Sequence, residues 1–327
     1  MEGSVKILVT GGSGFIGSAL VKGLVAEGHH VRVLDDNSRG RPRRLASVER
    51  DIELVDGDVR DPVVVDRATE GMEAVAHLAF VNGTQFFYEK PKLVLEVGVK
   101  GALNTLEAAI RHGVKRYWYT SSSEVYQTPP SVPTAEHAPM CIPDPLNPRY
   151  SYAGGKLISE LLAINYGREA FDQTVIVRPH NVYGPDMGWE HVIPQMALRA
   201  KTLSEQQPDG PLRFPIQGDG SQSRAFVYID DFVRGCMAAF LRGEDQQIYH
   251  VGTNDERTIH ELAELVVHEV GRAVEIVAGD LPPGGTLRRC PDIRKVAALG
   301  YAPEVSLEEG VATTVAWYLE NAGLQHA

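Results

Sequence analysis

A tyrosine and a lysine four residues apart, Tyr152 and Lys156, could form an acid–base pair. Side chains at this spacing share one face of a helix. A phenol with a pKa of about 10 is a poor base at neutral pH, but a neighbouring cation stabilises the phenolate and lowers that pKa. The pair could therefore take a proton from a substrate hydroxyl, although the same spacing also occurs in helices that have no catalytic role.

Three further polar residues, Ser122, Ser123 and Glu124, follow an apolar segment that we predict as a strand. In an open parallel sheet, ligands bind at the carboxyl ends of the strands. We therefore expect these side chains beside Tyr152 and Lys156 as candidate catalytic residues. Glu124 has an alternative role, which is to brace the loop without touching a substrate.

A glycine-rich turn near the start of the chain predicts a dinucleotide site. The apolar segment 5–10 runs into Gly11, Gly14 and Gly17 and then into a helical pattern. Gly11 permits the tight turn, Gly14 lets the backbone approach a pyrophosphate, and Gly17 lets the helix pack closely on the strand. The helix N-terminus would face the negative charge of the dinucleotide.

The acidic residue Asp35 ends the second predicted strand, 24 residues after Gly11, and could hold both hydroxyls of the adenosine ribose. Asp58, which follows the third strand, could accept a hydrogen bond from the adenine amine. NAD is therefore the expected cofactor. A basic cluster follows Asp35 and consists of Arg39, Arg41, Arg43 and Arg44. It could meet a 2′-phosphate, in which case NADP would be the cofactor, or it could form a solvated loop. The other expected cofactor contacts are Phe15, Ile16, Val59, Leu78 and Ala79, with Tyr152 and Lys156.

The order of patterns predicts an α/β fold, a Rossmann-type doubly wound parallel sheet with a smaller C-terminal α/β substrate lobe. Strands are expected at 5–10, 31–35, 52–55, 74–78, 115–120, 174–178 and 248–252, and helices at 14–27, 62–69, 91–112, 151–170, 229–242, 258–271 and 306–321. The run 204–222 is rich in Gln, Pro, Asp and Gly, which predicts a loop. The dinucleotide-binding domain would comprise 1–180 with 226–252 returning to it, and the substrate lobe 181–225 and 253–327.

Composition narrows the class of partner. The formal charge is −11, which argues against nucleic acid or an anionic membrane as a partner. Cys141, Cys236 and Cys290 are widely separated, and neither they nor the histidines have the spacing of a metal site, so no metal is expected. Without a recognisable leader or a long apolar run, the protein is expected to be soluble and cytoplasmic.

Taken together, these motifs resemble the extended short-chain dehydrogenase/reductase family, in its nucleotide-sugar epimerase, dehydratase and decarboxylase branch. The resemblance extends over nearly the whole chain. It includes Thr10 to Gly17, Gly57-Asp58, His77-Leu78-Ala79, Ser121 to Tyr126, Tyr152 to Lys156, Arg178 to Pro185, Gly218 to Arg224 and Arg289 to Ile293.

The resemblance implies that Tyr152 takes the proton from the sugar's O4 while the C4 hydride moves to NAD. It also implies that Lys156 binds the nicotinamide ribose and Ser122 hydrogen-bonds O4. The nucleotide diphosphate of a UDP-sugar, the favoured substrate, would meet Asn181, Arg224 and either Arg288 or Arg289, with Val192 near the base. Helices 91–112 and 151–170 resemble those that form a homodimer interface in the family.

Several reactions share the first oxidation, and a 4-epimerase is the expected one. A 4,6-dehydratase is disfavoured, because Ser123 stands where the dehydratases have an acid. The segments around Glu124, Tyr152 and Arg289 are similar to those of UDP-glucuronate decarboxylases, which is the main alternative. A net C4 dehydrogenase and a non-catalytic dinucleotide-sensing protein are the others. Two departures from the family pattern, Gly98 for a usual asparagine and Phe80 for a common alanine, could reshape the sugar pocket.

Overall fold

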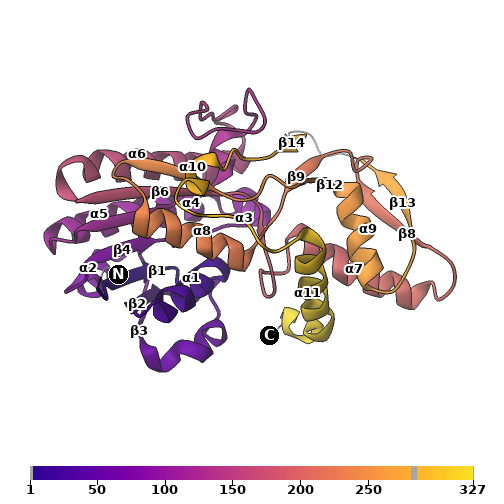
Figure 1. Ribbon diagram of the computed structural model, residues 1–327, viewed down its shortest axis with the longest axis horizontal. Helices are drawn as coiled ribbons and strands as arrows, with labels where there is room; N and C mark the ends of the chain where they lie inside the picture. Colours follow the sequence, from indigo (N-terminus) through magenta and orange to yellow (C-terminus); the bar gives the residue numbers. More distant parts are fainter. Residues whose placement is uncertain (1–2, 281–285, 327) are drawn as a thin grey trace.

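The computed structural model describes residues 3–280 and 286–326, and a seven-stranded sheet lies at the centre of its larger lobe (Figure 1). The strand order is β11-β6-β5-β4-β1-β2-β3, and every neighbouring pair is parallel. This is the predicted Rossmann-type doubly wound arrangement. The strands are β1 (Lys6–Thr10), β2 (His30–Asp35), β3 (Ile52–Asp56), β4 (Ala74–His77), β5 (Arg116–Thr120), β6 (Gln173–Pro179) and β11 (Gln247–Val251).

Helices cover both faces of this sheet, and the alternation of side chains along each strand explains why. Ile7 and Val9 of β1 pack with α1 (Phe15–Ala26) and α8 (Ile229–Arg242), whereas Leu8 points to the other face. There it joins a second apolar cluster with α2 (Pro62–Thr69), α5 (Gly101–Arg111) and α6 (Ser151–Ala170). Strands buried on both faces are apolar throughout, as parallel sheets require.

A smaller lobe lies beside the carboxyl ends of the main strands (Figure 1). Its two-stranded parallel sheet joins β8 (Leu212–Gln217) to β13 (Val274–Gly279). Other helices and strands of the chain include α7 (Val192–Gln206), α9 (Ile259–Glu269), α10 (Arg294–Ala297), α11 (Leu307–Glu320), β7 (Val182–Tyr183), β9 (Ser223–Ala225), β10 (Val227–Tyr228), β12 (Glu256–Thr258) and β14 (Arg288–Arg289).

The prediction of a loop over 204–222 was wrong. The segment contains the end of α7 and the whole of β8, in which Leu212, Phe214 and Ile216 are buried while the residues between them are exposed. Pro215 obscured this alternation because proline is rare within sheets. In a sheet of only two strands, the backbone of Pro215 needs no partner on its second edge.

The predicted helix 91–112 is interrupted. It divides into α4 (Pro91–Leu95), a π-helical turn (Glu96–Lys100) and α5, and a short helix, α3 (Thr84–Glu89), precedes it. The wider turn is centred on Gly98, whose carbonyl oxygen accepts a hydrogen bond from the Ser159 hydroxyl of α6. Turns of this kind often lie at functional sites. Over residues 3–280 and 286–326, no helix is long and apolar enough to cross a membrane.

Candidate active site

A cavity of about 490 Å³ opens at the carboxyl ends of the central strands. Its volume lies within the range of small-molecule and cofactor sites. Its walls include all five candidate catalytic residues and every residue expected to bind the cofactor. These are Gly11, Gly14, Phe15, Ile16, Gly17, Asp35, Asp58, Val59, Leu78, Ala79, Ser122, Ser123, Glu124, Tyr152 and Lys156.

The glycine turn has the shape of a dinucleotide cradle. Gly11 has a φ of 72°, and a Cβ on it would lie 2.8 Å from the Cα of Ala79. A Cβ on Gly17 would lie 2.0 Å from the carbonyl oxygen of Gly11, so only glycine permits this helix–strand contact. No side chain caps the N-terminus of α1, which leaves its first amide groups directed at the cavity. These residues therefore fit the pyrophosphate of NAD.

Asp35, which is expected to meet the adenosine ribose, is held in place in the wall of the cavity. Its carboxylate accepts hydrogen bonds from the backbone amides of Ser13 (3.0 Å) and Asn37 (2.9 Å). A carboxylate has about four acceptor positions, so capacity remains for two ribose hydroxyls. Asp58 is bound by the guanidinium and backbone of Arg60, which lower its pKa and keep it an acceptor for an adenine amine.

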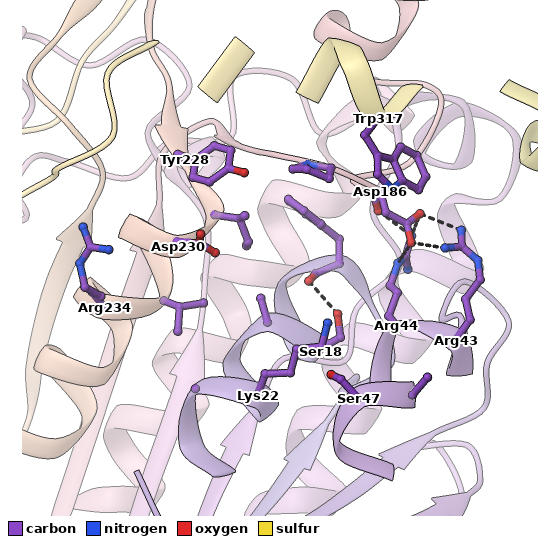
Figure 2. Close-up of a pocket in the computed structure, with 17 residues that line it drawn as sticks. Ser18, Lys22, Arg43, Arg44, Ser47, Asp186, Tyr228, Asp230, Arg234 and Trp317 are labelled. Atoms are coloured by element: carbon purple, nitrogen blue, oxygen red, sulfur yellow. Dashed lines mark hydrogen bonds and ion pairs between the residues drawn. The ribbon is translucent and has the colours of Figure 1, made fainter. Parts of the chain in front are cut away.

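A second cavity of about 790 Å³ lies behind the glycine turn, between α1, α8 and α11. Figure 2 shows Arg43 and Arg44 pointing together at Asp186 in its wall. Both guanidinium groups bind this carboxylate, Arg43 at 2.5 Å and Arg44 at 3.0 Å. Asp186 thus engages two members of the basic cluster, while Arg39, which lines the first cavity, pairs with Glu190 at 3.6 Å.

Tyr152 and Lys156 lie on the first turns of α6, where both are buried. The Lys156 ammonium donates to the carbonyl oxygen of Thr120 at 2.6 Å, at the end of β5. The phenol ring of Tyr152 is stacked on Phe87, with ring centroids 4.9 Å apart. One face of the helix thus delivers both groups to the edge of the sheet, as their spacing requires.

The pKa values of this pair differ from the sequence-based expectation. Burial raises the pKa of Tyr152, although hydrogen bonding from Ser122 opposes the change. Burial also lowers the pKa of Lys156 to about 7, with Glu160 acting in the opposite direction. The expected lowering of the phenol pKa by the lysine is absent, because the ammonium binds Thr120 and lies 5.9 Å from the centroid of the Tyr152 ring.

Glu124 is tied to an arginine from the distant end of the chain. Its carboxylate accepts a hydrogen bond from Arg289 at 2.7 Å. Burial alone would raise the pKa of Glu124, but Arg289, Arg149 and Arg224 together hold it below its ordinary value. Glu124 is therefore an anion at neutral pH, within a site that holds more positive than negative charge.

The other residues expected to hold the substrate differ in placement. Asn181 and Arg289 line the cavity, whereas Val192, Arg224 and Arg288 do not. Arg288 is exposed and bound to Glu256, so Arg289 is the one of the two candidate arginines that faces the cavity. Arg224 donates to the carbonyl oxygen of Thr286 at 2.7 Å.

A buried network beneath the site was missed by the sequence analysis. The carboxylate of Glu160, one turn after Lys156, binds Arg178 at 2.6 Å and also accepts from the Ser121 hydroxyl. The same guanidinium donates to Tyr126. The spacing of Tyr152, Lys156 and Glu160, each four residues apart, is the signal that could have revealed this shared face.

Comparisons with known proteins agree with this geometry. The NAD dependent epimerase/dehydratase family matches residues 7–252. A UDP-glucose 4-epimerase from Mycolicibacterium smegmatis is 34% identical, over 96% of this chain and 98% of the relative. A UDP-N-acetyl-alpha-D-glucosaminuronate decarboxylase from Bacillus cytotoxicus is 31% identical, with the same coverage of each chain.

A solved structure shares both the fold and the length of the chain. It is a dTDP-glucose 4,6-dehydratase from Streptomyces venezuelae with NAD and TYD bound, and it superposes with a TM-score of 0.84. It is 33% identical, and the match covers 98% of each chain. Similar proteins therefore carry out three different reactions, and the identity does not separate them.

Proposed function

The chain belongs to the NAD-dependent epimerase/dehydratase family, which uses NAD, and we propose that it is a nucleotide-sugar 4-epimerase acting by transient oxidation at C4. When bound, NAD supplies the acceptor and then the donor of the C4 hydride. The chain's own residues bind the sugar and move the proton at O4.

Tyr152 is the proposed base for the O4 proton. Ser122 would hold O4 in place, and the Lys156 ammonium would stabilise the phenolate during proton transfer. As the base, Tyr152 acts in its phenolate form, and because burial raises its pKa, a positive charge beside the phenol would be needed to stabilise that form. The same phenol would return the proton to O4 when the C4 hydroxyl is formed again.

The observation that carries the choice of epimerisation is the state of Ser123 and Glu124. Elimination across C5 and C6 needs an acid and a base beside these carbons. Ser123 provides only a hydroxyl, and Glu124 is held as an anion by Arg289. Since the lowered pKa makes this carboxylate a weak base, return of the hydride is the favoured outcome for the ketone.

A second candidate, decarboxylation of a uronate, is favoured by the unbalanced positive charge. The Arg149 guanidinium lines the cavity, and its buried Nε has no hydrogen-bond partner within the described residues. With Arg289 it could receive a carboxylate on C6 bidentately. Oxidation at C4 would then create a β-keto acid, which loses carbon dioxide without a further base.

The partner is proposed to be a nucleoside diphosphate sugar, with a UDP-sugar favoured. Arg149 and Arg289 line the cavity beside the single carboxylate of Glu124, and Arg224 acts on that carboxylate from outside the cavity wall. This part of the site therefore has an excess positive charge that a diphosphate would neutralise. Arginine suits this task because its planar fork binds phosphate oxygens in pairs.

The decisive experiment incubates the purified protein with UDP-glucose, UDP-glucuronate and dTDP-glucose and analyses the products by mass spectrometry and chromatography. An epimerase changes the retention of UDP-glucose at unchanged mass. Loss of carbon dioxide from UDP-glucuronate would establish the decarboxylase instead, and loss of water from dTDP-glucose the dehydratase. Accumulation of NADH in solution would identify a net dehydrogenase, and no conversion of a broader sugar panel would favour a sensing role.

We also propose a homodimer through the outer face of α4 and α6. Leu95, Ile158 and Leu161 are large apolar side chains that are 38–48% exposed there. Such a patch on packed helices is typical of an interface between copies. Light scattering would give the dimer mass for the native chain and the monomer mass for Leu161→Arg, and a monomeric native chain would refute the proposal.

A further inference from the structure

Two of the departures from the family pattern, Phe80 and Gly98, lie against each other beside the proposed base. Phe80 follows β4 and projects its ring over the π-helical turn. A Cβ on Gly98 would lie 2.2 Å from the Phe80 Cζ atom, and one on Gly155 would lie 3.0 Å from it. The ring thus occupies the space that a side chain at position 98 would otherwise fill.

The Phe80 ring also faces the ammonium of Lys156. The Nζ atom lies 4.1 Å from the ring centroid, closer than to the rings of Tyr119 (5.1 Å) or Tyr152 (5.9 Å). The Tyr152 and Phe80 rings form a T-shaped contact with centroids 5.1 Å apart. One phenylalanine therefore touches both members of the proposed acid–base pair.

We propose that Phe80 is a positioning residue for catalysis, which holds the charged Lys156 ammonium on its ring face and keeps the Tyr152 ring in place through a T-shaped contact. The inference deepens the proposed function, because it concerns the residues assigned there as base and cation. Phe80 itself moves no proton.

The physical basis is the shortage of polar partners for a buried ammonium. An ammonium has three donors, and within the described residues the only hydrogen bond of Nζ is the one to the Thr120 carbonyl. Aromatic faces attract a cation most strongly when water is absent. Without such compensation, the burial that already lowers the pKa of Lys156 to about 7 would favour the neutral amine still more.

The titratable groups around Lys156 act in different directions. His77 is buried, with its pKa lowered to about 3, so it is neutral and adds no repulsion at neutral pH. Tyr119 and Tyr152 are neutral phenols whose pKa values are raised. Glu160 alone supports the ammonium electrostatically, and its carboxylate is shared with Arg178. The Phe80 ring is thus the second support for the charge.

The test compares Phe80→Leu with the native chain, since leucine retains apolar bulk and removes the ring. The pKa of Lys156 is read by carbon-13 NMR of labelled lysine side chains, with the signal assigned by its loss in Lys156→Arg. Removal of a desolvated cation–π contact is expected to lower this pKa by roughly one pH unit. Turnover at neutral pH should fall about ten-fold while KM changes little, and its decline on the alkaline side should begin at lower pH.

Phe87→Leu is the matched control, because Phe87 stacks on Tyr152 and makes no ring contact with Lys156 among the contacts described. It should lower turnover through loss of packing on the phenol and leave the pKa of Lys156 where it was. Melting temperature and bound NAD are measured for each variant. If Phe80→Leu does not fold, Phe80→Met fills the same gap without a ring and is judged in the same way.

An unchanged or raised pKa of Lys156 in Phe80→Leu would overturn the proposal, as would an equal fall in Phe87→Leu. The NMR measurement needs no substrate, so it separates the two proposals. A lowered pKa together with no conversion of any nucleotide sugar would retain the role of Phe80 in holding Lys156 and reject the proposed reaction.

Discussion

Replacing Glu160 by glutamine should both destabilise the protein and shift the pH dependence of turnover. The reason is that this one buried carboxylate stabilises two cations, Arg178 and Lys156. Glu160 and Arg178 are 0% and 1% exposed, and their two hydrogen bonds measure 2.9 Å and 2.6 Å. Glutamine removes the charge and turns an amide donor toward a guanidinium donor. Leaving one member of a buried pair uncompensated costs about 3–5 kcal/mol.

The lower end of this range applies here. Arg178 would keep two acceptors, the Tyr126 hydroxyl and the carbonyl oxygen of Glu136 at 2.9 Å. A loss of about 3 kcal/mol corresponds to a fall in melting temperature of about 4 °C for a chain of 327 residues. Circular dichroism at a fixed NAD concentration measures this change directly.

The pH dependence follows from the loss of support for Lys156. Glu160 raises the pKa of this lysine, so glutamine at position 160 lowers it below about 7. The ammonium is the active form, so turnover falls as the pH rises through the pKa of Lys156. In Glu160→Gln this fall should occur at lower pH than in the native chain. The activity profile with the substrate identified by product analysis provides the measurement.

The double variant Glu160→Leu/Arg178→Met is the matched control. It removes both charges and should recover most of the stability, since apolar side chains of similar volume often replace a buried ion pair without loss. A single variant that melts at the native temperature, or a double variant less stable than the single one, would refute the reasoning about Arg178. If turnover of Glu160→Gln declines at the same alkaline pH as that of the native chain, the electrostatic link to Lys156 is refuted.

Three further predictions, two of them with a control variant, test the site. Tyr152→Phe should reduce kcat by about 10²–10⁴-fold with NAD retained, and activity near the native level would rule out the phenol as base. Gly17→Ala should lower the free energy of unfolding by more than about 1–3 kcal/mol and abolish NAD binding, because its Cβ would lie 2.0 Å from a carbonyl oxygen. Gly154→Ala is its control, since the Cβ would have only one neighbour, at 3.8 Å. It should raise the free energy of unfolding, measured by thermal unfolding, by up to about 1 kcal/mol. Arg289→Ala should raise KM for the nucleotide sugar by about 10–100-fold, whereas Arg288→Ala should leave KM unchanged, and equal effects would contradict the orientation of the two side chains.

Local sequence patterns were sufficient to predict the dinucleotide half of the fold. The turn from Gly11 to Gly17 and the acidic residue Asp35 are determined by short-range geometry, in which strand, turn and helix follow one another along the chain. The helical spacing of Tyr152 and Lys156 likewise places them on one face before any tertiary contact is known. For these elements, the residue types and their spacing carry the information.

The tertiary structure alone decided which distant groups meet. The pairing of Glu124 with Arg289 spans 165 residues, and it selects Arg289 over its neighbour Arg288 because adjacent residues of β14 point in opposite directions. The pKa values depend on burial, which reverses the expectation for Tyr152. The contact of Phe80 with Gly98 and Lys156 depends on three elements packing at one edge of the sheet. Pairings of this kind result from the way the whole chain packs, and the local sequence pattern contains no record of them.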